Sequence, residues 1–349
     1  SGKKLAEVKT WHKLNMEVLQ RTANRGSIST ATDTGYNIGN SLKLESDNSE
    51  YLHRTPSSTG STSTWTASMW VKRTELGSHQ LGICARESGS TVDFWRFTSD
   101  DKIRFHVYST APSSEVYYAD TDAVFRDTSA WYHVVLILDA TNADGSERLK
   151  LFVNGIEQTA NWQGSASESN RFRENGVSSF LGQYKMQIGR GTYGVDHYFN
   201  GYISEVNVLD GIAAAPTAFG EYDSDSGIWI PKEYEGSYGT NGFYLDFADS
   251  GDLGDDESGN GNDFAEVNLA AADQATDTPT NNFATSNFLI SQGGYFVTTE
   301  GGTKCVLGTS GPGNNIGGVS CLSTIAVSKG KWYMEMKNDL ANDSVDSYA

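Results

Sequence analysis

The strongest pattern of hydrophobic and polar positions in the chain begins at Trp131 and ends at Thr159. The stretch Trp131–Leu138 is apolar on both of its alternating faces. One face comprises Tyr132, Val134, Leu136 and Leu138, and the other comprises Trp131, Val135 and Ile137. Because a strand that is apolar on both sides must be covered on both sides, the pattern predicts a central strand of a two-layer β structure.

The residues that follow predict a turn and then a hairpin. Asp139–Glu147 is rich in Asp, Asn, Gly and Ser, which favour turns. Large apolar residues alternate along Leu149–Val153, and Asn154-Gly155 then suits the positive φ values of a type I′ turn. We therefore expect Leu149–Val153 to pair with Ile156–Thr159. The β-branched residues and the central Asn-Gly pair disfavour a helix here.

Short strands separated by polar, glycine-containing breaks lie on both sides of this hairpin. Their spacing predicts an all-β fold, an antiparallel β-sandwich of the jelly-roll type that folds by itself over residues 41–222. The further strands that we expect are Ser41–Leu44, Trp65–Arg73, Gln80–Ala85, Val92–Thr98, Lys102–Ser109, Tyr117–Tyr118, Lys185–Gly189 and Tyr198–Leu209.

Residues 3–23 are the strong candidate for a helix, because apolar residues recur there at helical spacing. Gly26 stands where a C-cap glycine would, and residues 26–40 have the Ser, Thr, Asn and Gly content of an extended linker. The helix either packs on its own domain or acts as a docking arm that buries its stripe against a partner subunit. The residues of this stripe are Leu5, Val8, Trp11, Leu14 and Val18.

Composition and charge fit this picture and exclude some partners. The 349 residues allow two domains, and the 37 glycines and 17 tyrosines fit an all-β protein rich in turns. A net charge of −18 argues against nucleic acid or an anionic membrane surface as the main partner. No apolar run approaches the roughly 20 residues of a membrane span, so we expect no membrane insertion.

The cysteines and the first residues bear on where the protein is made. Cys84, Cys305 and Cys321 are too few and too scattered for a disulfide framework or a four-ligand zinc site. Their odd number predicts mostly reduced thiols and synthesis in a cytoplasm. The opening residues SGKKLAEVK lack the apolar region of a signal peptide, so we expect no classical secretion.

Several strings of residues resemble a known family. WTASMWVKR (65–73), AWYHVVLILDA (130–140), LKLFVNGIE (149–157), QIGRG (187–191) and FNGYISEVNVLDG (199–211) resemble the laminin-G-type, concanavalin A-like jelly roll. More narrowly, the strings from Asn40 to Arg73 and from Ile228 to Phe264 resemble tailed-phage virion proteins, a group common in marine phages. That group is described as tail fibre or virion structural proteins. The resemblance spans roughly residues 40 to 290.

Together, pattern and resemblance predict four parts. Residues 1–40 are the helix and linker, 41–222 the jelly roll, 223–282 an acidic connector around one short strand (Gly242–Phe247), and 283–349 the start of a second β-sandwich. In the phage group, KGKWYMEM (329–336) resembles the first strand of a SPRY-like sandwich. Too few residues follow it to complete such a sandwich, so we expect a fragment of a longer protein. The strands expected in the last part are Gly294–Thr299, Lys304–Gly308, Cys321–Val327 and Gly330–Met336.

One group of carboxylates is a candidate for a catalytic site. Glu45, Asp47 and Glu50 have the E-x-D-x-x-E spacing of jelly-roll glucanases, in which one carboxylate attacks the sugar and another protonates the leaving oxygen. The residues between them are Ser and Asn rather than apolar, which is typical of a turn. We therefore expect a loop, no catalytic residue and no enzyme activity. The histidines show no metal-ligand spacing.

A second cluster is the candidate for a cofactor. Oxygen-bearing side chains concentrate in the Gly-rich segment from Asp246 to Asp263, which suits Ca²⁺. Alignment of Gly261 with the bend glycine of an EF-hand places Glu266 one residue short of the bidentate position. The alternative is a solvated acidic loop without a metal. The candidate ligands are Asp249, Asp252, Asp255 and Asp256.

Exposed aromatic rings could stack on sugars, although most aromatic residues of a sandwich belong to its core. The sequence does not tell which rings are exposed, and it therefore identifies no ligand-binding residue. The available rings are Trp95, Tyr117, Tyr118, Trp162, Tyr184 and Tyr193.

The leading hypothesis is a non-enzymatic, tail-fibre-like virion adhesin that attaches to a host-surface glycan. Its partners would be other virion proteins and further copies of itself, for which a trimer is one candidate. The alternatives are a purely architectural virion or capsid-decoration component and a jelly-roll glycan hydrolase. Under the leading hypothesis the protein is made in the host cytoplasm and resides in the virion.

Overall fold

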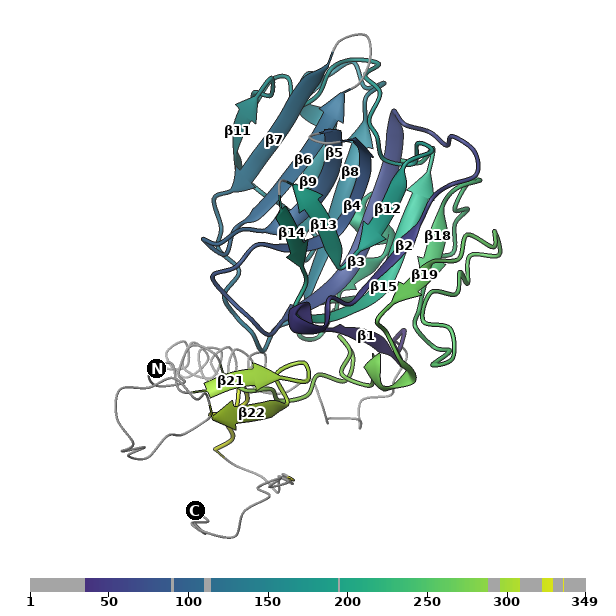
Figure 1. The fold of residues 1–349 in the computed structure, drawn as a ribbon. Coiled ribbons are helices and arrows are strands. Elements are labelled where there is room, and N and C mark those ends of the chain that lie inside the picture. Colours follow the sequence, from purple (N-terminus) through teal and green to yellow (C-terminus); the bar gives the residue numbers. More distant parts are fainter. Residues whose placement is uncertain are drawn as a thin grey trace, which may run out of the picture.

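The computed structural model describes residues 35–88, 91–109, 114–193, 195–287, 296–307, 322–328 and 335. Within them, two antiparallel sheets pack face to face, and the helices are short 3-10 turns (Figure 1). This confirms the predicted all-β antiparallel sandwich. The turns are η1 (Ser46–Asn48), η2 (Gly145–Glu147), η3 (Pro216–Ala218) and η4 (Ala271–Asp273).

The first sheet, sheet A, has eight strands. Their spatial order is β10, β9, β8, β3, β15, β1 and β20, while β18 pairs with β15 beyond the end of β1. The bounds are β10 (Ile156–Glu157), β9 (Leu149–Val153), β8 (Tyr132–Asp139), β3 (Thr64–Arg73), β15 (Gly201–Asp210), β1 (Ser41–Leu44), β20 (Gln274–Ala275) and β18 (Phe243–Leu245).

The second sheet, sheet B, also has eight strands, in the order β11, β7, β6, β5, β4, β12, β2 and β19. Their bounds are β11 (Ala160–Gly164), β7 (Glu115–Thr121), β6 (Ile103–Ser109), β5 (Thr91–Phe97), β4 (Gln80–Ser88), β12 (Lys185–Ile188), β2 (Tyr51–Arg54) and β19 (Ala265–Val267).

Three two-stranded hairpins accompany the sheets. The hairpin of β13 (Arg190–Tyr193) and β14 (Val195–Tyr198) lies over β4 on the outer side of sheet B (Figure 1). A Cβ at Gly191 of this hairpin would lie 2.2 Å from Leu81 Cδ2, so the two layers are in close contact. The other two hairpins are β16 (Gly220–Tyr222) with β17 (Trp229–Pro231), and β21 (Phe296–Thr299) with β22 (Lys304–Leu307).

Strand β8 has the two covered faces that its pattern predicts. It lies between β9 and β3 in sheet A. Tyr132, Val134, Leu136 and Leu138 join the main core between the sheets. On the other face, Val135 and Ile137 pack with Leu209 and Phe219, and Trp131 packs with Trp70, Tyr202 and Trp229. Sheet A therefore packs on both faces: against sheet B in the main core, and against hydrophobic clusters on its outer face.

The predicted Asn-Gly hairpin is confirmed. Asn154 and Gly155 have φ values of 50° and 78°, and Ile156 pairs with Val153. A Cβ at Gly155 would lie 2.4 Å from the Trp229 ring, so glycine is required for packing as well as for the turn. The returning strand β10 is shorter than predicted and ends at Glu157. Gln158 N still donates to the Leu151 carbonyl, whereas the Thr159 carbonyl accepts from Asp122 N.

The segment 223–282 contains four strands, where the sequence predicted one. Besides β17 and β18, it contributes β19 to the edge of sheet B and β20 to the edge of sheet A. Phe243, Leu245 and Phe264 enter the main core. The sequence analysis underestimated this part, because strands of two or three residues are too short for alternation to be recognised.

Only part of the N-terminal region can be compared with its prediction. The helix over residues 3–23, with Leu5, Val8, Trp11, Leu14 and Val18, lies outside the described residues. Residues 36–40, predicted as linker, pack on the sandwich: Ile38 is buried, and the Tyr36 hydroxyl donates to Glu205 Oε2 at 2.9 Å.

At the C-terminal side, β21 and β22 confirm two of the four predicted strands. The strand predicted over Cys321–Val327 is wrong for residues 322–327, which are irregular apart from one bridge between Ser323 and Ser286. Leu322 and Val327 are exposed there, so alternation is not supported by a buried face. Except for residue 335, the strand predicted over Gly330–Met336 lies outside the described residues.

Candidate functional site

A row of side chains crosses the outer face of sheet B. The register places Ala265 opposite His53, His53 opposite Gln187, and Gln187 opposite Cys84. The row continues through Phe94, His106 and Tyr118 to Gln163. Its central members, from Gln187 to His106, are buried, whereas His53 and Tyr118 are half-buried. Access to this face is therefore greatest at its two ends.

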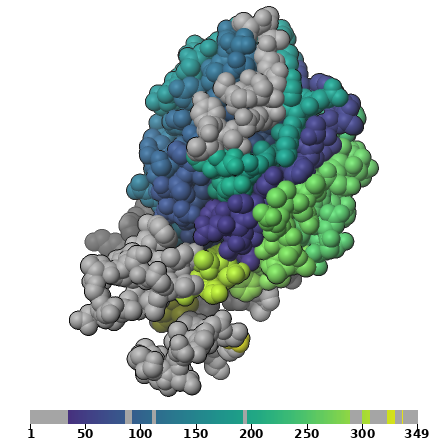
Figure 2. All heavy atoms as spheres, in the orientation of Figure 1, coloured from purple at the N-terminus to yellow at the C-terminus, as the bar shows by residue number. Residues whose placement is uncertain are grey.

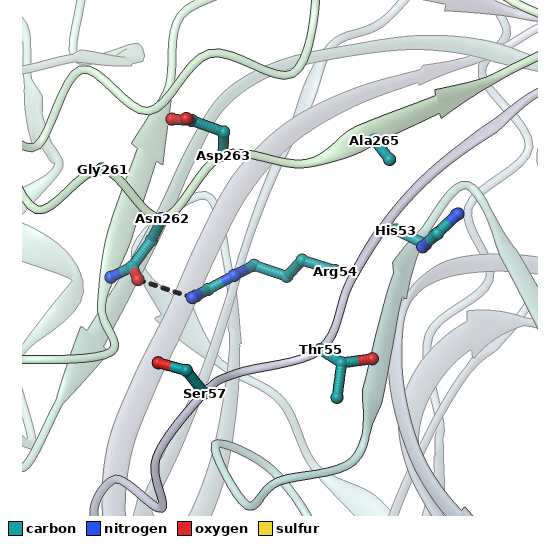
Figure 3. A pocket seen from close by; sticks show the side chains of 8 residues that line it. All are labelled: His53, Arg54, Thr55, Ser57, Gly261, Asn262, Asp263 and Ala265. Atoms are coloured by element: carbon teal, nitrogen blue, oxygen red, sulfur yellow. Dashed lines mark hydrogen bonds between the residues drawn. The ribbon is translucent and has the colours of Figure 1, made fainter.

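The end at His53 opens into a hollow in the surface. This hollow, the Arg54 pocket, has a volume of about 420 Å³ and lies where β2 meets the loop before β19 (Figure 3). In Figure 2 the purple atoms of the early chain meet the green atoms of the later chain along this face. The pocket is lined by His53, Arg54, Thr55, Ser57, Gly261, Asn262, Asp263 and Ala265.

Arg54 is held in place by polar and aromatic contacts. Its Nη2 donates to Asn262 Oδ1 at 2.5 Å (Figure 3). Its Nη1 donates to the Asn241 carbonyl at 3.2 Å. The guanidinium also lies 5.9 Å from the Phe243 ring centroid and 5.8 Å from that of Phe264. Burial lowers the pKa of Arg54, while Asp256 and Asp263 act in the opposite direction. Arg54 is thus a rigid cation at the pocket wall.

The outer face next to the pocket is also cationic. Burial lowers the pKa of His53, and the nearby charges of Lys185 and Arg190 lower it further. The Arg190 guanidinium lies 4.8 Å, and the Lys185 ammonium 5.8 Å, from the centroid of the Tyr51 ring. These cations occupy the surroundings of the ring, so the arrangement favours hydrogen bonds and negative charge over sugar stacking on Tyr51.

A smaller hollow of about 280 Å³ lies elsewhere on the sandwich, around Glu115, Arg148 and Arg173. Its charges are already paired, since Arg173 bonds Glu115 and Arg148 Nη2 lies 3.0 Å from Glu174 Oε2. A ligand would have to compete with these ion pairs. The Arg54 pocket, where the guanidinium is bound to neutral oxygens, is the better candidate.

The Glu45 motif forms a turn, as predicted. Residues Ser46–Asn48 are a 3-10 turn, and Ser49 follows with a φ of 59°. Glu50 Oε2 accepts from the Glu45 backbone nitrogen at 2.7 Å, and Glu45 Oε1 accepts from the Gly301 nitrogen at 2.7 Å. Burial raises the pKa of Glu50, against hydrogen bonds that lower it. The carboxylates of Glu45 and Glu50 thus accept hydrogen bonds from backbone N–H groups, and Asp47 lies within the turn itself.

The acidic segment is organised by its own backbone. Asp249 Oδ1 accepts from the Gly251 nitrogen, Asp252 Oδ1 from the Gly254 nitrogen, and Asp256 Oδ1 from the nitrogens of Tyr244 and Ser258. Burial and the nearby Asp263, Asp252 and Asp249 raise the pKa of Asp255. Over the described part of the chain, no group of three or more His, Cys, Asp or Glu side chains is placed to hold a metal. The geometry gives the calcium hypothesis no support, and it stays a prediction.

The aromatic residues considered for sugar stacking have different positions. Trp95 and Tyr117 are core residues, so they are wrong as surface candidates. The Trp162 ring packs against that of Phe105, with 5.3 Å between the ring centroids. Tyr118 and Tyr184 are half-buried. The side chain of Tyr193 lies outside the described residues.

Sequence reasoning missed the pocket residues His53, Arg54 and Asn262. The string Tyr51–Arg54 carries a weak signal, because Leu52 alone is apolar between polar or aromatic neighbours. Asn262 was considered only as an oxygen ligand. Since Asn262 follows Arg54 by 208 positions, no local pattern could join them.

Comparison with known proteins identifies the domain. Residues 45–216 match the model of a laminin-G family described as the concanavalin A-like lectin/glucanases superfamily. These residues therefore form a concanavalin A-like domain, as the resemblance implied. Among curated proteins no match is found. No helix in the described residues is long and apolar enough to span a membrane.

Solved structures with similar folds have low identity. A heptameric SAP-like pentraxin from Limulus polyphemus is 14% identical with a TM-score of 0.33, and the match covers 50% of this chain and 78% of that one. Domains LG4-5 of mouse laminin α1 give 11% and 0.31, with coverages of 49% and 40%. The enzymatically active domain of bacteriophage CBA120 tailspike protein 2 gives 9% and 0.32, with coverages of 55% and 31%. At these TM-scores none of the three informs on ligand or activity.

Proposed function

We propose that this protein is a non-enzymatic virion protein, a tail-fibre-like adhesin that binds a host-surface glycan at the Arg54 pocket. The observation that carries the proposal is the lining of that pocket. It offers a fixed guanidinium, an amide, two hydroxyls, an imidazole and the carboxylate of Asp263 at the open end of sheet B. Such groups form the directional hydrogen bonds that sugar hydroxyls require.

The charges around the pocket specify the kind of sugar. Arg54, Lys185 and Arg190 are the cations around the pocket, on a chain with a net charge of −18. The carboxylates that oppose them are Asp263 in the lining and Asp196, which pairs with Arg190. The lowered pKa of His53 leaves its imidazole neutral at pH 7, as a hydrogen-bonding group. A sugar that carries a carboxylate would form a charge-assisted bond here, and such bonds are about twice as strong as neutral ones. We therefore expect acidic glycans to bind better than their neutral counterparts, and added salt to weaken the difference.

A glycan array probed with the full chain tests this proposal. Lys185→Ala and His53→Ala should each reduce binding of acidic glycans at least several-fold. The matched control is Lys150→Ala, which removes the same charge from β9 in sheet A and should bind like the wild type. Equal binding by all four proteins would place any glycan site elsewhere.

The virion assignment is supported by the residue strings that resemble tailed-phage virion proteins, together with the concanavalin A-like domain. Other virion proteins and further copies of the chain would be its partners. Light scattering after gel filtration should then show a homo-oligomer, for which a trimer is one candidate. A monomer at micromolar concentration would argue against self-assembly.

Glu45 and Glu50 each accept a backbone hydrogen bond that fixes the fold. Because these carboxylates have structural partners, we infer a glycan-binding protein and not a hydrolase. Glu45→Gln should therefore leave glycan binding unchanged. Release of reducing sugar from a bound glycan by the wild type, and its loss in Glu45→Gln, would favour the hydrolase alternative. Absence of all glycan binding would favour the architectural alternative.

A further inference from the structure

A buried lysine on the outer face of sheet A has an unusual set of partners. Lys72, on β3, has a fully buried side chain. Its Nζ lies 2.7 Å from Asp277 Oδ2, 2.7 Å from Asn282 Oδ1 and 2.7 Å from the Phe283 carbonyl oxygen. An amine, a carboxylate and a side-chain amide thus meet at one point, although Asp277 and Asn282 follow Lys72 by 205 and 210 positions in the sequence.

The surroundings of this cluster are largely aromatic and shielded from water. Trp131 Nε1 donates to Asp277 Oδ1 at 3.0 Å, and the Tyr202 ring centroid lies 5.8 Å from Lys72 Nζ. Asp277 is buried as well. Burial lowers the pKa of Lys72, with Asp277 acting against it, so the cost of a neutral amine is reduced. A neutral, desolvated lysine amine is a nucleophile.

The amide of Asn282 is held in a defined orientation. Its Oδ1 accepts from Lys72, while its Nδ2 donates to the Ser129 carbonyl at 2.7 Å. The nucleophile is therefore next to the amide carbonyl, and the nitrogen that would leave is fixed on the opposite side. Positioning of this kind can replace much of the entropy cost of a bimolecular reaction.

We propose that Lys72 and Asn282 form an intramolecular isopeptide bond, with Asp277 as the group that carries the proton. Asp277 takes a proton from the Lys72 ammonium. Rotation about the Cε–Nζ bond turns the freed electron pair towards Asn282 Cγ, and the Nζ–Cγ bond forms as the Cγ–Nδ2 bond breaks. A second proton passes from Nζ to Nδ2, which leaves as ammonia. The proton held on Asp277 leaves with it, as ammonium, and no oxidant or other reactant is needed.

The bond would fasten residues 277–283 covalently to β3. A salt bridge alone needs only Asp277, yet the cluster also aligns the amide of Asn282 on both its oxygen and its nitrogen. The two joined residues lie 210 positions apart, so the crosslink would close almost the whole sandwich into one loop. Closing a loop of this length strongly restricts the unfolded chain.

Mass spectrometry of the full chain, after prolonged incubation at neutral pH, tests the proposal. The intact mass should be lower than the sequence mass by one ammonia. Proteolysis should yield a branched peptide that joins the Lys72 and Asn282 segments. Asn282→Ala and Asp277→Asn should both have the full expected mass and a lower melting temperature than the wild type. Asn281→Ala, the matched control, should keep the crosslink because its side-chain amide bonds Thr276 and not Lys72.

Three outcomes would overturn the assignment. The first is a folded wild type with full mass and no branched peptide. The second is loss of one water with a branch at Asp277, which would make the carboxylate the acceptor instead of the amide. The third is persistence of the crosslink in Asn282→Ala. If Asp277→Asn fails to fold, the comparison of Asn282→Ala with Asn281→Ala still decides.

Discussion

The two outer faces of the sandwich have different kinds of cover. On sheet A, Trp70, Trp131, Tyr202 and Trp229 form a buried aromatic cluster with Ile38. Its members come from β3, β15 and β17, from the residue before β8 and from the segment before β1. On sheet B, the β13–β14 hairpin covers β4, and it directly follows β12 in the chain. Sheet A is covered by several segments, some of them distant in the chain, and sheet B by one hairpin that directly follows β12.

This difference shows how one strand pattern can serve two purposes. Both sheets direct alternate residues into the shared core, so alternation predicts the inward side of each. Their outward residues depend on which later segments return to them. Where segments 212–238 and 275–285 return, the face becomes a second core. Where they do not, polar side chains such as His53 remain accessible for binding.

The largest effect should come from removal of the returning segments. Residues 41–222 without the rest lose Phe243, Leu245 and Phe264 from the main core. At about 2 kcal/mol for each side chain, the loss is roughly 6 kcal/mol, which is comparable to the whole stability of many domains. In contrast to the expectation from sequence, we predict that 41–222 is largely unfolded while 35–287 folds. Urea denaturation of both fragments measures this, and equal midpoints would show that the segments after residue 222 contribute no net stability.

A smaller effect should follow from the loss of one aromatic side chain of the cover. Trp229→Ala opens a cavity over sheet A and removes the indole N–H that donates to His133 Nδ1 at 2.9 Å. The expected loss of stability is about 3 to 5 kcal/mol. Trp162→Ala, at the edge of sheet B, should cost clearly less because that ring is half-buried. Chemical denaturation that ranked the two variants in the reverse order would contradict the comparison.

The pH dependence of stability should identify the same cover. Burial lowers the pKa of His133 to about 3, whereas the unfolded residue titrates near 6.5. Below about pH 6.5 the unfolded state therefore binds a proton that the folded state does not, and stability falls until about pH 3. His133→Gln should reduce this slope when unfolding is followed at several pH values.

The contribution of His133 must be read as a difference between variant and wild type. Burial raises the pKa of Asp93 to about 7 and that of Glu205 to about 7, and these groups act in the opposite direction. Through these two carboxyl groups the stability of the folded protein falls as the pH rises from about 4 to about 7. An identical pH profile for His133→Gln and the wild type would show that His133 is not buried in its neutral form.

The smallest effect is expected on the open end of sheet B. His53 is half-buried, and its ring lies against that of Tyr51 with 5.9 Å between the centroids. Because part of its surface is already in water, His53→Ala should change stability by less than about 0.5 kcal/mol. Thermal denaturation checks this against the large effect of Trp229→Ala. A melting temperature that fell as far as that of Trp229→Ala would make His53 a structural residue and would weaken the pocket as a ligand site.

The strands of the first part could be predicted well from the sequence. Long alternating stretches such as β3, β8 and β15 are recognisable because burial of every second residue is a local property of the chain. The short strands β19 and β20 were not, since their pairing depends on segments more than 200 positions away. The segment that carries β19 and β20 is held by Asp and Asn side chains that accept or donate hydrogen bonds to the backbone. A segment rich in Asp and Asn has the composition of a loop, so its sequence does not indicate strands.

The candidate site could not be predicted for a related reason. Arg54 contacts Asn241 and Asn262, which lie 187 and 208 positions further along the chain. Asp249 and Asp252 were predicted as oxygen ligands for a cation. In the structure, each accepts a hydrogen bond from the backbone nitrogen of the residue two positions later. Sequence shows that such groups are present, but the register of two sheets decides what each one meets.

The contacts of Ile38 have a consequence for how the sandwich can be built into something larger. The Ile38 backbone accepts from Thr278 Oγ1 at 3.0 Å and from Thr280 Oγ1 at 3.1 Å. The segment that leads into β1 and the segment that follows β20 therefore meet at one point. A module whose entrance and exit coincide can be inserted into a host loop without spreading it. Tension applied through the two flanks would load these few hydrogen bonds first, and the sheets behind them would stay relaxed.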